Sequence, residues 1–245
     1  MRGFIPPRTG EEQVFVKKIT RILDLCDGLG KVQSTLFMDL RQQQLFMAQA
    51  NKYPGIKVHL LCGYDGEGER RLAVCCPEYS DIEDVAVPLV VLRAKLVDTD
   101  VSHKDFLGAA MSLRIDREYM GDILISDGYV YIICHKNVAD IIKDELISVK
   151  RSFVSFEEWF EPLHFEKHYS EERTTTVASL RADSVVAAVL NKSRTEAVKL
   201  IRQGNVKVNQ MDVENVDFEI FDNDFAQLAK VSIKAMVELW KKDRI

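Results

Sequence analysis

The sequence of 245 residues lacks the short motifs that mark most catalytic and metal sites. It has no CxxC pair, no HExxH motif, no GxSxG motif and no GxGxxG motif after a predicted strand. It therefore gives no support for a zinc site, a serine hydrolase or a dinucleotide site. The five cysteines are odd in number, which favours a reducing cytosol over a disulfide-linked secreted fold. We expect no metal, no cofactor and no catalytic residue.

A long apolar segment and an excess of positive charge are also missing. The longest apolar run, residues 85–92, is far too short to cross a bilayer and is interrupted by Pro88. The N-terminus has no apolar core of a signal peptide. These absences predict a soluble, cytoplasmic protein. The formal net charge is -5, so any surface for nucleic acid has to be a local basic patch.

The order of predicted elements indicates an α+β fold with three domains and a linker. Helices over residues 11–27 and 40–51, with strands over 56–62 and 71–76, predict a small N-terminal α/β domain, residues 1–82. Residues 83–160 have the order β-α-β-β-α-β, the split βαβ pattern of ferredoxin-like and RNA-recognition folds, with the last strand expected over 148–156. Residues 161–176 have the composition of a linker. Residues 177–245 form the third domain.

The most informative segment, Leu180 to Asn209, predicts two short helices followed by a strand. The first helix spans residues 180–190. Ser193 begins the second helix, and Glu196 three residues later completes a capping box. Gly204 suits the end of this helix, and Val206 alternates with polar neighbours as in a half-buried strand. Beyond it, the sequence predicts a strand over 217–221 and a helix over 225–245.

Positive charge gathers on one side of this segment. Between residues 180 and 210 there are six Lys or Arg and only two acids. At about 100° per residue, Arg194, Lys199 and Arg202 share one arc of the second helix, and its apolar residues occupy roughly the opposite arc. Arginine and lysine clusters suit phosphate groups, but exposed basic helix faces are also common without any ligand. Charge alone leaves both interpretations open.

Individual residues in this segment also have simpler explanations. Ser193 is accounted for as a helix cap, and Asp183 as an ion-pair partner of Arg181 or Lys192. Six acids between residues 212 and 224 either weaken the basic face or merely solvate a loop. The ordered combination of residues is therefore more informative than any one of them.

That combination resembles the S4 domain, an RNA-binding domain first described in ribosomal small-subunit protein S4. The S4 pattern has an Arg and an Asp that open helix one, a Ser-Arg pair that opens helix two, and a Gly before a basic strand. The resemblance implies that the basic face binds structured RNA. The RNA-binding residues that it implies are Arg181, Asp183, Ser193, Arg194, Lys199, Arg202, Gln203, Lys207 and Asn209. The family pattern continues with closing strands and an Arg-Gly-aromatic-Gly-Arg segment, from which the tail of this chain departs.

Three upstream segments, residues 37–45, 63–71 and 108–125, resemble the YlmH family of bacterial S4 proteins encoded near cell-division genes. This resemblance implies a non-catalytic protein, monomeric when free, that acts on the large ribosomal subunit. It further implies contacts with ribosomal RNA and tRNA in ribosome-associated quality control of stalled nascent chains.

Two other functions remain open from the sequence. Pseudouridine synthases also carry S4 domains, typically ahead of a large catalytic domain with an essential Asp, whereas here the domain comes last. The other alternative is a protein-interaction adaptor whose basic patch is incidental. In the middle domain, Tyr129 and Tyr131 share a strand face that could stack on bases. The aromatic signature of an RNA-recognition motif is absent, which favours packing within the sheet.

Overall fold

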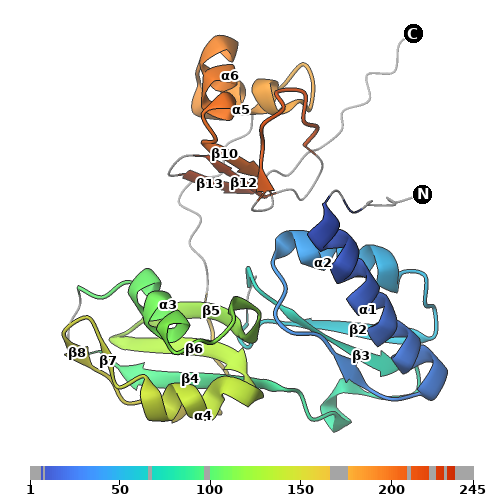
Figure 1. The fold of residues 1–245 in the computed structure, drawn as a ribbon, viewed down its shortest axis with the longest axis vertical. Coiled ribbons are helices and arrows are strands. Elements are labelled where there is room, and N and C mark those ends of the chain that lie inside the picture. The colour runs from blue at the N-terminus through green and yellow to red at the C-terminus, as the bar shows by residue number, and fades with distance from the viewer. Residues whose placement is uncertain are drawn as a thin grey trace. The chain divides into compact units, whose positions relative to one another are not determined.

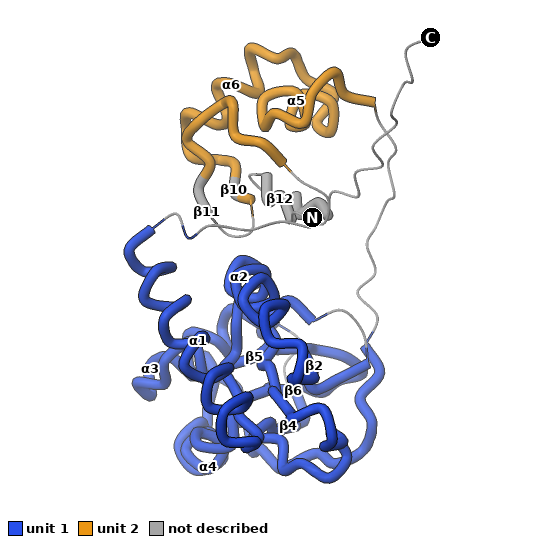
Figure 2. The backbone as a smooth tube through the Cα atoms, turned by 90° about the vertical axis from the view of Figure 1, so that its right-hand side faces the viewer, with its two compact units in different colours: residues 1–167 blue, residues 168–245 orange. Residues whose placement is uncertain are grey.

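The computed structural model describes residues 7, 9–65, 68–96, 100–165, 176–208, 211–220, 225–228 and 231–234 (Figure 1). The chain forms two compact units, residues 1–167 and residues 168–245 (Figure 2). Within the described ranges, no helix combines the length and the apolar character that crossing a membrane requires.

The first unit begins with two helices on a three-stranded sheet. Helix α1 (Gly10–Leu29) is capped by the Thr9 side chain, and α2 (Leu40–Ala50) begins with a capping box formed by Asp39 and Gln42. Strands β1 (Gln33–Ser34), β2 (Ile56–Leu61) and β3 (Leu72–Pro77) form an antiparallel sheet in the order β1-β3-β2. Ile19, Leu23 and Phe46 pack between the helices and this sheet. The predicted helices and longer strands are confirmed, and β1 is an addition.

The rest of the first unit has the β-α-β-β-α-β order that the sequence predicts. Its elements are β4 (Leu89–Lys95), α3 (His103–Ser112), β5 (Met120–Ser126), β6 (Tyr129–His135), α4 (Lys136–Glu145) and β9 (Glu157–Glu158), with 3₁₀ turns at Ile82–Asp84 and Arg117–Tyr119. The sheet is antiparallel in the order β5-β6-β4-β9. Asp127 and Gly128 both have positive φ, 52° and 78°, as a tight turn between two strands requires.

The single strand predicted over residues 148–156 is wrong. The chain instead forms a small hairpin of β7 (Ser148–Val149) and β8 (Ser152–Phe153), and the fourth strand of the main sheet is β9. Lys150 adopts a left-handed conformation, φ 54°, which reverses the chain inside the predicted strand. Its Nζ lies 2.9 Å from Asp105 Oδ2, so a contact distant in sequence holds the turn.

The two faces of the β5-β6-β4-β9 sheet pack against different parts of the unit. Helices α3 and α4 cover one face, where Phe106 and Ile142 pack on Ile132. On the opposite face, Ile133 and the buried Tyr131 pack against Phe37 and other residues that precede position 82. Tyr131 therefore belongs to the core, in agreement with packing within the sheet. Because this core joins residues on both sides of position 82, the predicted boundary between the first two domains stays a prediction.

A buried polar network explains two of the segments that resemble the YlmH family. Asp122 on β5 accepts hydrogen bonds from the Tyr64 hydroxyl (2.9 Å), the Glu69 amide (2.8 Å) and the Arg70 amide (3.2 Å). The Arg70 guanidinium, in a residue only 8% exposed, donates to the carbonyls of Met120 (3.0 Å) and Phe37 (2.9 Å). Burial lowers the pKa of Arg70. Arg70 is thus a structural residue that ties the loop to the sheet.

The second unit contains the predicted helix pair. Helices α5 (Ala182–Leu190) and α6 (Arg194–Arg202) pack on a sheet of order β11-β10-β12-β13. The strands are β10 (Val206–Val208), β11 (Met211–Asp212), β12 (Phe225–Leu228) and β13 (Val231–Lys234). Val186, Ala197, Ile201 and Val206 are at the centre of the core. Gly204 has φ 70°, so the chain leaves α6 through the left-handed conformation that glycine favours.

The sequence predictions beyond residue 211 are mostly wrong. Within the described part of the predicted strand 217–221, only Glu219 forms a β-bridge, to Arg181. Residues 225–228 and 231–234 are strands and not a helix, because β12 pairs with β10 and completes the sheet. These strands agree with the closing strands of the S4 pattern. The rest of the predicted helix, residues 229–230 and 235–245, lies outside the described residues, as does Asn209.

We expect Asp122→Asn to destabilise the first unit by about 2–3 kcal/mol, because an amide nitrogen would then face buried N–H and O–H donors. Urea unfolding followed by far-UV circular dichroism measures the change. Asp116→Asn is the matched control, since Asp116 is exposed and its side chain caps no helix. Equal stability of the two variants would contradict the structural role of Asp122.

Candidate nucleic-acid interface

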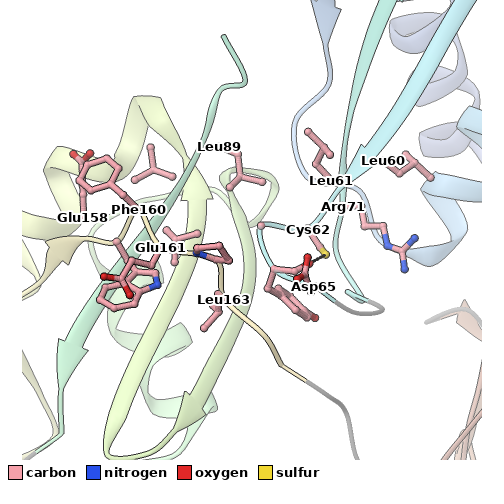
Figure 3. A pocket seen from close by; sticks show the side chains of 16 residues that line it. Leu60, Leu61, Cys62, Asp65, Arg71, Leu89, Glu158, Phe160, Glu161 and Leu163 are labelled. Carbon is pink, nitrogen blue, oxygen red and sulfur yellow. Dashed lines mark hydrogen bonds between the residues drawn. The ribbon is translucent and has the colours of Figure 1, made fainter. Parts of the chain in front are cut away.

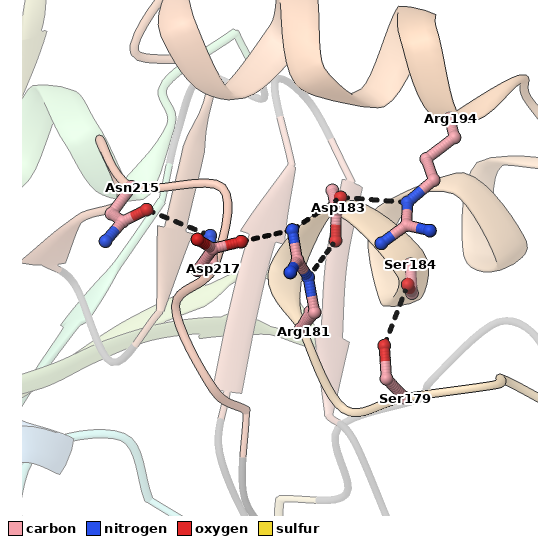
Figure 4. A network of polar contacts seen from close by, with 7 residues as sticks. All are labelled: Ser179, Arg181, Asp183, Ser184, Arg194, Asn215 and Asp217. Carbon is pink, nitrogen blue, oxygen red and sulfur yellow. Dashed lines mark hydrogen bonds and ion pairs between the residues drawn. The ribbon is translucent and has the colours of Figure 1, made fainter.

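Two arginines at the start of α5 and α6 converge on one carboxylate, Asp183 (Figure 4). Arg181 donates from Nε to Asp183 Oδ1 (3.1 Å) and from Nη2 to Oδ2 (3.3 Å). Arg194 donates from Nε to Oδ2 of the same residue (2.9 Å). The sequence predicts Arg181 or Lys192 as the ion-pair partner of Asp183. The structure confirms Arg181, adds Arg194, and pairs Lys192 with Glu196 (3.6 Å) instead.

The carboxylate is buried while both guanidinium groups reach solvent. The side chain of Asp183 is 4% exposed, compared with 40% for Arg181 and 58% for Arg194. Burial by itself would raise the pKa of Asp183, but the hydrogen bonds and charges of Arg194 and Arg181 outweigh it and lower the pKa to about 2. Asp183 is therefore ionised at neutral pH and fixes the direction of both arginines. A carboxylate this well covered can orient the two guanidinium groups but offers little surface to a ligand.

The first turn of α6 is fixed by the predicted capping box. The Ser193 amide donates to Glu196 Oε2 (3.0 Å), and the Glu196 amide donates to Ser193 Oγ (3.3 Å). This box sets where Arg194 begins the helix and thus where its side chain meets Asp183. Further along α6, Lys199, Arg202 and Gln203 are exposed. Helix α6 therefore carries three exposed basic side chains, Arg194, Lys199 and Arg202, and the capping box fixes its first turn.

A residue that the sequence analysis did not single out also contacts this site. Asp217 forms an ion pair with Nη2 of Arg181, and its backbone amide donates to Asn215 Oδ1 (3.0 Å). In the sequence, the acids of residues 212–224 stand out only as a group. Loop residues have no regular spacing from which the ion-pair partner of one acid can be predicted. Asp217 shows that at least one of them faces the basic residues.

The predicted RNA-binding residues are brought together to different degrees. Arg181, Asp183 and Arg194 share one network, and Ser193 caps the helix that carries Arg194. Lys199, Arg202 and Gln203 follow on α6. Lys207 lies in β10, where its backbone pairs with Asp212 and Gln227. Asn209 lies outside the described residues. Their contact with RNA stays a prediction.

The first unit contains a cavity of about 750 Å³ between β2, the start of β4 and residues 158–163 (Figure 3). Its walls combine apolar side chains such as Leu60, Leu61 and Leu163 with the charged Arg71, Glu158 and Glu161. Asp65, at its rim, pairs with His164 (2.7 Å). In the part of the chain that the structure describes, no cluster of His, Cys, Asp and Glu is arranged to hold a metal ion. The lining therefore offers both apolar and charged groups.

Comparison with known proteins agrees with this geometry. Residues 180–220 match the family model of the S4 domain. Residues 82–160 match the model described as "Putative RNA-binding domain in YlmH". The chain therefore contains an S4 domain and, ahead of it, a domain of the type found in YlmH.

Two relatives give a more particular assignment. The chain is 27% identical over 242 residues to "Ribosome-associated protein quality control protein P2" of Bacillus subtilis (strain 168), across 94% of this chain and 93% of that protein. The solved structure "Cell division protein ylmH from Streptococcus pneumoniae" is 21% identical with a TM-score of 0.52 and covers 64% of this chain and 96% of its own, which shows a shared fold. The resemblance to the YlmH family is thus confirmed: this chain matches the YlmH domain model and the S4 domain model, and it aligns with these relatives.

We expect Asp183→Asn to lower the free energy of unfolding of the second unit by about 2 kcal/mol at pH 7. The pKa of Asp183 is depressed, so its stabilisation is full above about pH 4 and is lost as the pH falls toward 2. The difference between wild type and variant should therefore shrink in acid. Hydrogen exchange of the α5 and α6 amides at several pH values measures it. A difference independent of pH would contradict an ionised, stabilising Asp183.

Proposed function

We propose that the second unit binds structured RNA through the basic face formed by Arg181, Arg194, Lys199 and Arg202. The observation that carries this proposal is the fixation of two solvent-exposed guanidinium groups by a single buried carboxylate. A flexible arginine side chain loses conformational entropy when it binds a ligand. These two arginines have already lost much of that entropy on folding. Such preorganisation favours a ligand whose charges have fixed spacing, as the phosphates of folded RNA do.

The guanidinium groups of the basic face suit the phosphates of RNA better than the carboxylates of a protein partner. Guanidinium groups bind phosphate oxygens through paired N–H donors, and each neutralised phosphate releases condensed counterions. The S4 domain match covers this face, which supports RNA as the polyanion. Gln203 and Lys207 are proposed to extend the contact from α6 toward β10.

The RNA that we propose is ribosomal RNA and tRNA on the large ribosomal subunit, during quality control of stalled nascent chains. Support comes from the Bacillus subtilis relative, which is named as a ribosome-associated quality control protein and aligns along almost the whole chain. In this proposal the protein is cytoplasmic, monomeric when free and non-catalytic. A link to cell division is part of the proposal only through the family resemblance.

An RNA-modifying enzyme and a protein-interaction adaptor are the alternatives. The domain models that match this chain describe RNA-binding domains, which favours binding without catalysis over modification. Incubation with cellular RNA followed by analysis of modified nucleosides separates the enzyme from the binder. Crosslinking to ribosomal particles followed by sequencing of the bound RNA separates the adaptor from the binder.

We expect Arg194→Ala combined with Lys199→Ala to weaken binding to purified large-subunit ribosomal RNA by roughly tenfold, because two solvent-exposed ion pairs with phosphate are lost. The slope of log affinity against log salt should fall by about 2, one for each phosphate no longer neutralised. Filter binding over a salt series measures both quantities.

The matched control is Lys17→Ala combined with Arg21→Ala, which removes two exposed positive charges from α1 in the first unit. This control should change affinity little. An equal loss of RNA affinity in the two double variants would mean that only the net charge matters. No loss of affinity in either variant would mean that the basic face is an ordinary solvated surface.

A further inference from the structure

Arg181 lies between two carboxylates that differ in their surroundings. Asp183 contacts its guanidinium from the buried side, through Nε and Nη2. Asp217 contacts Nη2 from a side chain that is 58% exposed. Figure 4 shows the two acids flanking the guanidinium group, with Asp217 on the side away from Arg194. Asp217 therefore occupies a position at which an incoming phosphate would contact Arg181.

The backbone places Asp217 there with some precision. The loop that carries it is held to the start of α5 by three hydrogen bonds, from the amides of Ala182, Asp183 and Ile220 to the carbonyls of Phe218 (2.7 Å), Val216 (3.3 Å) and Leu180 (2.8 Å), respectively. The Asn215 side chain accepts from the amide of Asp217 itself. The contact with Arg181 thus depends on a tethered loop rather than on chance approach of a mobile side chain.

Orientation of Arg181 does not require this second acid. Asp183 already holds the guanidinium by two hydrogen bonds, and its burial keeps those bonds away from competing water. An additional exposed carboxylate adds little to stability, because water screens such pairs. Its main effect is to compete with any other anion that approaches the same guanidinium group.

We propose that Asp217 is an internal competitor of the RNA phosphate for Arg181, and that it restricts binding to RNAs whose other contacts are sufficient to displace it. This inference rests on the proposed RNA-binding function of the second unit. Asp217 acts here as a repulsive element that lowers the affinity of the basic face for phosphate in general. It is thus a specificity-determining residue of the RNA site.

The test is Asp217→Asn in the full chain, which removes the charge and keeps the size of the side chain. Purified large-subunit ribosomal RNA and bulk tRNA are the probes, in filter binding over a salt series. We expect binding about two- to fivefold tighter than wild type, the range of a screened surface ion pair. The gain should diminish as the salt concentration rises. Melting curves confirm that the variant remains folded.

Glu214→Gln is the matched control, because it removes one negative charge from the same loop at an exposed position. A double-mutant cycle with Arg181→Gln then tests the mechanism. If Asp217 acts through Arg181, its effect should disappear in the Arg181→Gln background. In that background, Asp217→Asn should raise the RNA affinity no more than Glu214→Gln does.

Three results overturn the inference. In the first, Asp217→Asn changes the RNA affinity no more than Glu214→Gln does. In the second, Asp217→Asn weakens RNA binding. In both cases the proposed RNA site still stands if Arg194→Ala reduces the affinity. A gain that persists without Arg181 would show that the acid acts on another group. Absence of RNA binding in the wild-type chain would instead remove the proposed function and this inference together.

Discussion

The basic face depends on one buried carboxylate shared by two arginines. Asp183 lies where the N-terminal ends of α5 and α6 meet, so its charge joins two helices that also share an apolar core containing Val186 and Ile201. A buried charge without partners would be strongly unfavourable, so the helices are held in the arrangement that supplies both guanidinium groups. The same contact that orients the helices also orients the groups that face solvent. The helix arrangement and the proposed binding surface are thus specified by one interaction.

The local elements of this site could be read from the sequence because their causes are local. The capping box of Ser193 and Glu196, the glycine after α6 and the alternation in β10 depend on neighbours a few residues away. The hairpin at Asp127 and Gly128 is of the same kind. The three-centre network of Arg181, Asp183 and Arg194 could be anticipated only in part, since helical spacing does not show which of several arginines reaches the acid.

Errors arose where distant strands or contacts determine the structure. Residues 225–234 have a helical pattern of apolar residues, yet β12 pairs with β10 and satisfies backbone groups that a helix would leave open at the sheet edge. Lys150 interrupts a predicted strand with a left-handed backbone conformation, and its ammonium group pairs with Asp105, a residue distant in sequence. Asp217 was missed for the same reason: its partner is set by hydrogen bonds between a loop and the start of α5.

The short span of the helix pair has a consequence for the order of assembly. Arg181, Asp183 and Arg194 lie within one turn-linked segment, and contacts so close along the chain form quickly because little chain entropy has to be lost. Asp217 follows later along the chain and reaches Arg181 only after a loop has closed. During folding the arginine cluster can therefore be in place before Arg181 gains its second, exposed carboxylate.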